Sequence, residues 1–163
     1  MRHILSIIVT NNAGVLGRVV GLFSRRGYNI DSLSVGTTED QRYSRITVSV
    51  QGDDQVVEQI QKQVAKLVDV QDVFELKSEC AIFRELCLVK VEATAVSRPD
   101  IFNVANVFRA NIIDVSTKTI TMEINGDLDK TNAFIEIMKP YGILEIVRTG
   151  LAAVARGAEK AKI

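Results

Sequence analysis

The order of strand and helix patterns constrains the fold of this 163-residue chain more than any other feature. In the first half, apolar residues alternate or cluster as in strands and recur at helical spacing, in the order strand, helix, strand, strand, helix, strand. These segments are 4–10, 14–26, 30–36, 43–50, 54–67 and 70–76. The second half repeats this order. We therefore predict an α+β protein built from two tandem ferredoxin-like βαββαβ units.

The second unit is predicted from the same signals. Pro99 is typical of the first turn of a helix, and Pro140 stops the helix that begins near Leu128. Its predicted strands are 86–93, 112–115, 119–124 and 143–147. We expect two domains, residues 1–78 and residues 79–163, with a lysine-bearing tail after Gly150.

The strand at 43–50 alternates between apolar and polar residues, which predicts that only one of its faces is buried. A unit of about eighty residues buries only about 60–65% of the surface of its unfolded chain, so it is marginally stable alone. We therefore expect a homodimer, formed by pairing of sheet edges or by packing of sheet faces.

The segment 11–19 lies where the first strand meets the first helix. Asn11, Asn12 and Gly14 precede the helical apolar pattern, so the free N–H groups of the first turn and the positive end of the helix dipole are available to a small anion. No nucleophile, general base or set of metal ligands accompanies them in this segment. We interpret the loop as a binding site rather than a catalytic site.

A free amino acid suits such a loop. Backbone N–H groups near Gly14 would bind its carboxylate, amide side chains would bind either charged end, and aliphatic side chains would surround its side chain. Each residue taken singly also fits a structural role, as a helix cap, a turn or part of the core. The candidate effector-binding residues are Asn11, Ala13, Gly14, Val15, Leu16, Asn29, Ile30 and Val35.

Composition argues against several other classes of protein. Lys plus Arg equals Asp plus Glu at 20 each, so no net positive charge attracts nucleic acid or anionic membrane. The segment 43–48 lacks the paired aromatic residues of RNA-binding sheets, and the glycines from Gly14 onward do not have the dinucleotide-binding spacing. Two cysteines and one histidine do not form a metal site. With no leader-like or membrane-spanning run, we expect a cytoplasmic protein that needs no cofactor or metal.

The segment 11–35, NNAGVLGRVVGLFSRRGYNIDSLSV, resembles the ACT domain of the regulatory (small) subunit of acetolactate synthase. Matches continue to the end of the chain, so the resemblance covers nearly all of it. They are 67–70, 84–86, 89–91, 108–109, 112–115, 148–150 and 155–157. Asn12 is a departure, because the family often has an acidic residue there.

The resemblance implies a non-catalytic partner of the large, catalytic subunit of acetolactate synthase, an enzyme of branched-chain amino-acid synthesis. It implies that the chain activates this subunit and confers feedback inhibition by valine. It places valine at the interface of two ACT domains, held by Asn11–Leu16 and Asn29. Thiamine diphosphate, magnesium and FAD are then expected in the catalytic partner.

Two other interpretations remain. A free-standing ACT-type amino-acid sensor would have no need of the complete second unit, which ends in Arg148, Thr149 and Gly150. A small enzyme such as an acylphosphatase shares the βαββαβ order, but it needs an arginine in the strand–helix loop, and residues 11–14 contain none.

Overall fold

The computed structural model describes residues 1–157, which divide into two compact units. The first contains residues 1–82 together with 151–157, and the second contains residues 83–150. The expected domain boundary was therefore wrong at both ends of the second unit, because the segment after Gly150 returns to the first unit. The rest of the expected tail, residues 158–163, lies outside the described residues.

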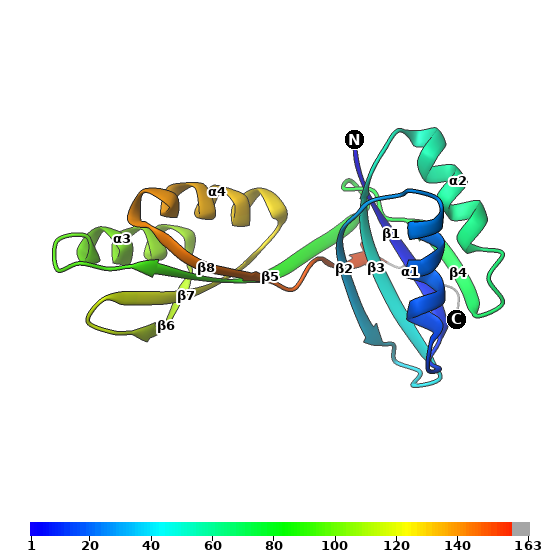
Figure 1. Cartoon of the computed structure of the whole chain (residues 1–163), viewed down its shortest axis with the longest axis horizontal. Helices are drawn as coiled ribbons and strands as arrows, with labels where there is room; N and C mark the ends of the chain where they lie inside the picture. Colours follow the sequence, from blue (N-terminus) through cyan, green and yellow to red (C-terminus); the bar gives the residue numbers. More distant parts are fainter. Residues whose placement is uncertain (158–163) are drawn as a thin grey trace. The chain divides into compact units, whose positions relative to one another are not determined.

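The first unit has the predicted element order, with a four-stranded antiparallel sheet and two helices on one face (Figure 1). The strand order is β2-β3-β1-β4, so β2 and β4 form the sheet edges. The elements are β1 (Arg2–Thr10), α1 (Val15–Arg25), β2 (Ile30–Thr37), β3 (Tyr43–Gln51), α2 (Asp54–Val64) and β4 (Val70–Glu75).

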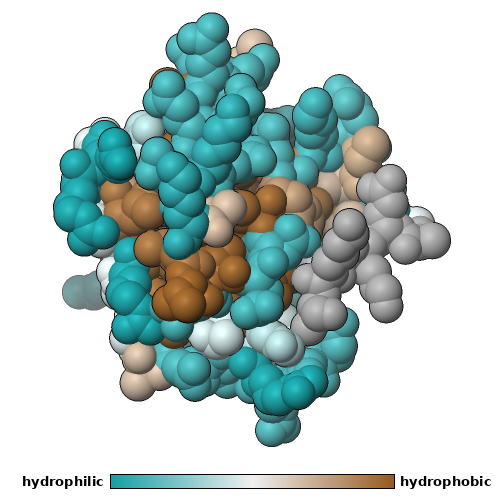
Figure 2. Space-filling view, turned by 90° about the vertical axis from the view of Figure 1, so that its right-hand side faces the viewer, coloured by the Kyte–Doolittle hydropathy of each residue, from teal (hydrophilic) through white to brown (hydrophobic). Residues whose placement is uncertain are grey.

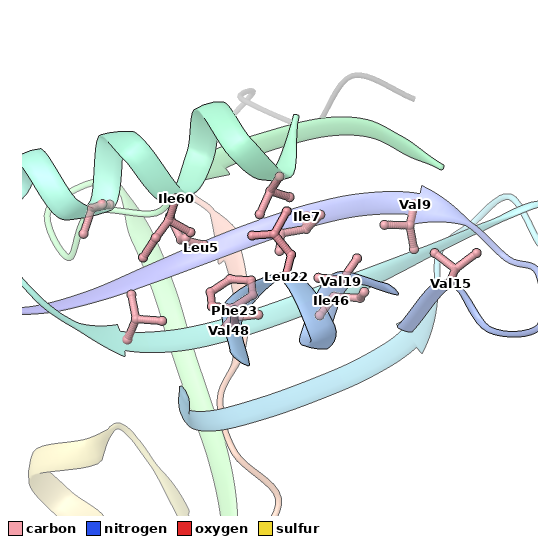
Figure 3. Packing of buried hydrophobic residues seen from close by; sticks show 13 residues of the cluster. Leu5, Ile7, Val9, Val15, Val19, Leu22, Phe23, Ile46, Val48 and Ile60 are labelled. Atoms are coloured by element: carbon pink, nitrogen blue, oxygen red, sulfur yellow. The ribbon is translucent and has the colours of Figure 1, made fainter. Parts of the chain in front are cut away.

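The main core of this unit lies between the sheet and its helices (Figure 3). Alternate residues of β1 and β3 face α1 and α2, as the sequence periodicity predicts. Asp53 caps α2 by accepting a hydrogen bond from the N–H of Val56 at 2.8 Å, which satisfies one free donor of the helix. The largest fully buried side chains of this core are Leu5, Ile7, Phe23, Ile46 and Ile60.

The opposite face of the same sheet is also buried. Its side chains include Ile4, Ser6, Ile8, Thr47 and Ser49, each at most 7% exposed. The expectation that β3 is half-buried was therefore wrong for Thr47 and Ser49.

The chain itself covers this second face. A short strand, β9 (Ala152–Ala155), pairs with the start of β5 (Ala81–Glu92). Leu151 and Ala153 are buried there, and so is Ala81. Of the two expected ways of forming a dimer, packing of sheet faces is therefore not available on this face, because a segment about 75 residues beyond the end of β4 covers it.

The second unit repeats the fold with the strand order β6-β7-β5-β8. Alternate apolar residues of β5 and β7 pack with α3 and α4, and the two strands pair in antiparallel register. The elements after β5 are α3 (Arg98–Phe108), β6 (Asn111–Val115), β7 (Thr119–Gly126), α4 (Leu128–Met138), a 3-10 turn (Lys139–Tyr141) and β8 (Ile143–Arg148). The predicted α+β class with two tandem ferredoxin-like units is confirmed.

Candidate functional site

The N-terminus of α1 is open. Gly14 is the residue before the helix, its φ is +83°, and no side chain caps the helix. The N–H of Val15 donates to the carbonyl of Asn12 at 3.3 Å. Among residues 1–157, no acceptor receives the N–H of Leu16 or Gly17. Two exposed donors at the positive end of a helix are therefore free to bind a carboxylate.

Asn11 positions this loop rather than capping the helix. Its backbone N–H donates to the carbonyl of Arg42 at 2.7 Å, and its Nδ2 donates to the carbonyl of Gln41 at 2.9 Å. Its Oδ1 accepts a hydrogen bond from Ser44 Oγ at 3.0 Å. These three bonds fasten the loop to the turn that joins β2 to β3 and to the start of β3. Ala13, next to Gly14, is exposed on the same loop.

Arg18 is a residue of this site that the sequence reasoning missed. Its guanidinium lies 3.4 Å from the position that a Cβ on Gly14 would occupy, and its Nε donates to Asp69 Oδ2 at 2.7 Å. The hydrogen bond from Arg18 holds the pKa of the half-buried Asp69 carboxyl below its usual range. The available signal was spacing, since residues four apart on a helix lie on the same face. Arg18 adds a positive charge beside the free N–H donors.

The aliphatic candidates divide into two groups. The side chain of Val15 is 2% exposed and packs in the core near Val9 (Figure 3), so the interpretation that it lines an open pocket was wrong. Leu16 and Val35 are 40% and 46% exposed and remain available to a ligand or a partner. Figure 2 shows one face of the first unit, on which hydrophobic residues lie exposed among hydrophilic ones.

Asn29 and Ile30 lie at the opposite end of the sheet from the loop. Ile30 at the start of β2 pairs with Val50, whereas Thr37 at its end pairs with Ser44, beside the loop. Seven residues of extended strand span roughly 23 Å. Asn29 is exposed, and its Nδ2 donates to Asp31 Oδ1 at 3.3 Å. A single chain therefore does not bring Asn29 to the loop.

Family models cover both units. Residues 5–72 match the small subunit-like ACT domain of acetohydroxyacid synthase (AHAS), and residues 84–157 match the small subunit of acetolactate synthase. No helix within residues 1–157 has both the length and the apolar character needed to cross a membrane.

Relatives match over almost their whole length. A probable acetolactate synthase small subunit of Archaeoglobus fulgidus is 49% identical over 98% of this chain and 100% of its own. The acetolactate synthase small subunit of Haemophilus influenzae is 48% identical over 96% and 97%.

A solved structure agrees with these relatives. The crystal structure of the acetolactate synthase small subunit of Thermotoga maritima superposes with a TM-score of 0.89 at 39% identity, covering 98% of this chain and 99% of that one. The chain belongs to the acetolactate synthase small-subunit family, with an ACT domain in its first unit.

Proposed function

We propose that this chain forms a homodimer that binds valine where two ACT domains meet, activates the catalytic subunit of acetolactate synthase and makes it sensitive to feedback inhibition. The proposal rests on one observation, namely that the candidate effector residues of a single chain lie in two separate places. The loop lies at one end of the edge strand β2, and Asn29 lies at the other.

A second copy would unite them. The outer edge of β2 has no strand beside it in the described part of the chain. If two copies pair antiparallel along β2 with the two-fold axis at the middle of the strand, Ile30 of each lies opposite Thr37 of the other. Asn29 of one copy then lies near the loop 11–16 of the other. Two equivalent sites form, each with residues from both chains.

The chemistry of this combined site matches the three parts of valine. Its carboxylate accepts hydrogen bonds from the N–H groups of Leu16 and Gly17, close to the charge of Arg18. The Oδ1 of Asn29 accepts from the ammonium group. The exposed side chains of Leu16 and Val35, with the half-buried Ile30, surround the isopropyl group.

Feedback inhibition then follows from linkage. Valine shifts the catalytic subunit to a less active state if the dimer binds valine more tightly when associated with that state. The reaction and its cofactors, thiamine diphosphate, magnesium and FAD, belong in this proposal to the catalytic subunit in the cytoplasm. The complete second unit favours this function over a free-standing sensor.

Isothermal titration tests the proposal. Valine, leucine and isoleucine are titrated into the full chain, with and without the catalytic subunit. Losing a hydrogen bond to a charged group costs roughly 1.5–3 kcal/mol, so Asn29→Ala should weaken valine binding about 10- to 150-fold. Asn103→Ala, an exposed change in the other unit, is the matched control. Normal valine binding by Asn29→Ala, or loss of activation along with inhibition, would contradict the site.

A further inference from the structure

Residues 151–157 form a segment that we call the C-terminal strap. It belongs to the first unit, although the chain reaches it directly from β8 of the second. The chain thus passes between the units twice, at 82–83 and at 150–151. Gly150, with a φ of +78°, is the last residue before the strap.

Besides the pairing of β9 with β5, four further hydrogen bonds join the strap to the first unit. Ser34 Oγ of β2 donates to the carbonyl of Leu151 at 2.6 Å, and Arg45 Nη1 of β3 donates to the carbonyl of Ala153 at 3.2 Å. Arg156 donates its backbone N–H to the carbonyl of Cys80 at 2.8 Å and its Nε to that of Ala81 at 3.2 Å. The strap is therefore attached to β2 and β3 at one side and to the start of β5 at the other.

The layer between strap and sheet differs from the main core. The strap contributes one large side chain, Leu151, and the small side chains of Ala153 and Ala155, and the sheet contributes Ser6, Thr47 and Ser49 beside Ile4 and Ile8. The Oγ atoms of Ser6 and Ser49 are buried there without a hydrogen-bond partner among the described residues. Small apolar side chains contribute little burial energy, and unpartnered buried hydroxyls are unfavourable. This layer is therefore held more weakly than the core beneath α1 and α2.

Ser34 connects this weak layer to the proposed effector site. It lies in the middle of β2, between Ile30 and Thr37, on the strand that carries two of the candidate effector residues. If a second copy and an effector order β2, they also order Ser34, whose hydroxyl group donates to the carbonyl of Leu151. Leu151 in turn directly follows the second unit.

We propose that the strap is a releasable connection between the effector edge and the second unit, held to β2 by the hydrogen bond from Ser34 to Leu151. Valine at the β2 edge orders this strand and holds the strap in place. When the strap is released, only the connection at 82–83 still joins the second unit to an ordered part of the first unit. This inference rests on the proposed function, because it needs an effector at β2.

Reciprocity gives the sign of the effect. If valine strengthens attachment of the strap by some factor, attachment of the strap must strengthen valine binding by the same factor, so release of the strap weakens valine binding. Ser34→Ala removes one hydrogen bond, and a neutral hydrogen bond of ordinary strength corresponds to a change of about 2- to 10-fold in an equilibrium constant. Ser32→Ala is a matched control, because Ser32 lies on the same strand and face.

Amide hydrogen exchange tests this connection. Exchange is measured on the full chain and read from peptides that cover residues 151–156. Exchange should be about 2- to 10-fold faster in Ser34→Ala than in Ser32→Ala. Valine should slow it in the wild type. Leu151→Ala, which removes a side chain that is 2% exposed, should speed exchange further than Val154→Ala, which alters one that is 51% exposed.

Equal exchange in Ser34→Ala and Ser32→Ala would overturn the connection. The connection would also be overturned if valine bound to the wild type in a parallel titration but did not slow exchange of the strap. Valine that does not bind at all would overturn the proposed function instead, and with it the effector part of this inference. The comparison of the two serine variants would still test whether Ser34 holds the strap.

Discussion

The two units share one fold but differ in how their sheets are covered. The central strand β1 of the first unit is buried at seven consecutive positions, His3 to Val9. In the second unit, β7 buries every second residue, and β6 is exposed along its whole length. The same element order therefore produced one sheet with both faces covered and one with alternating burial.

This difference shows what a repeated fold leaves undetermined. The order of the elements along the chain and the positions of the helices follow from local patterns in both units. The covering of the second sheet face depends on a segment far along the chain, since Ser34 and Leu151 are 117 residues apart. Leu144, Ile146 and Val147 of β8 remain between 39% and 52% exposed.

The largest expected effect concerns one central strand from each unit, on the sheet face that points away from the helices. Ile8 of β1 is fully buried, whereas Leu88 of β5 is half-buried. We expect Ile8→Ala to lower the free energy of unfolding of the first unit by about 2–5 kcal/mol, and Leu88→Ala to lower that of the second by about 1 kcal/mol. Urea denaturation with a probe in each unit measures both values. Equal losses would show that the strap does not cover the first sheet.

A smaller effect is expected from removing one ion pair in each unit. Arg148 donates through its Nη2 and Nε to the buried carboxylate of Glu85, and through its Nη1 to Asn132 at 3.0 Å. Arg148→Leu leaves a buried charge without its partner and should cost the second unit about 3 kcal/mol. Arg18→Leu removes only an exposed pair with Asp69 and should leave the denaturation midpoint unchanged.

Acid titration sharpens this second prediction. Because Arg18 lowers the pKa of Asp69, any stability from that pair is present at neutral pH and is lost as the pH falls through the folded pKa of Asp69. The exposed position of the pair predicts little dependence on pH. The first unit could instead lose much of its stability at acid pH, with no such loss in Arg18→Leu. That result would contradict the assignment of this pair as weak.

The smallest effect compares the two cysteines, which are both free thiols. Burial raises the pKa of the Cys87 thiol; the positive charge of Arg148 opposes this shift, and the negative charge of Glu85 adds to it. Cys80 is exposed. Iodoacetamide at neutral pH should therefore alkylate Cys80 alone, because the thiolate is the reacting form. Peptide mapping that found both thiols labelled at similar rates would show that β5 opens readily.

The sequence predicted most elements but not the covering of the first sheet. Alternation in β3 indicated polar residues facing solvent, and the structure buries Thr47 and Ser49 instead. A signal existed in β1, where Ile4 and Ile8 place apolar residues on the face opposite Leu5, Ile7 and Val9. Apolar residues on both faces of a strand indicate burial on both sides. Periodicity could not show which segment provides that burial.

The candidate site was predicted in part. The open helix N-terminus after Gly14 follows from local sequence, and the structure shows its free donors. The bonds of Asn11 to the β2–β3 turn and the approach of Arg18 to Gly14 depend on packing that no local pattern reveals. The separation of Asn29 from the loop became visible only with the strand register.

A mixed dimer tests the central claim most directly, namely that each valine site combines two chains. One copy carries Gly14→Asp, which places a carboxylate beside that of valine at a position of positive φ, and the other carries Asn29→Ala. Two different affinity tags allow the mixed dimer to be purified. One of its two sites then has an unaltered loop from one chain and an unaltered Asn29 from the other. The account predicts one valine site of wild-type affinity per mixed dimer and none in either parent dimer. Calorimetry that found no such site in the mixed dimer would contradict the account.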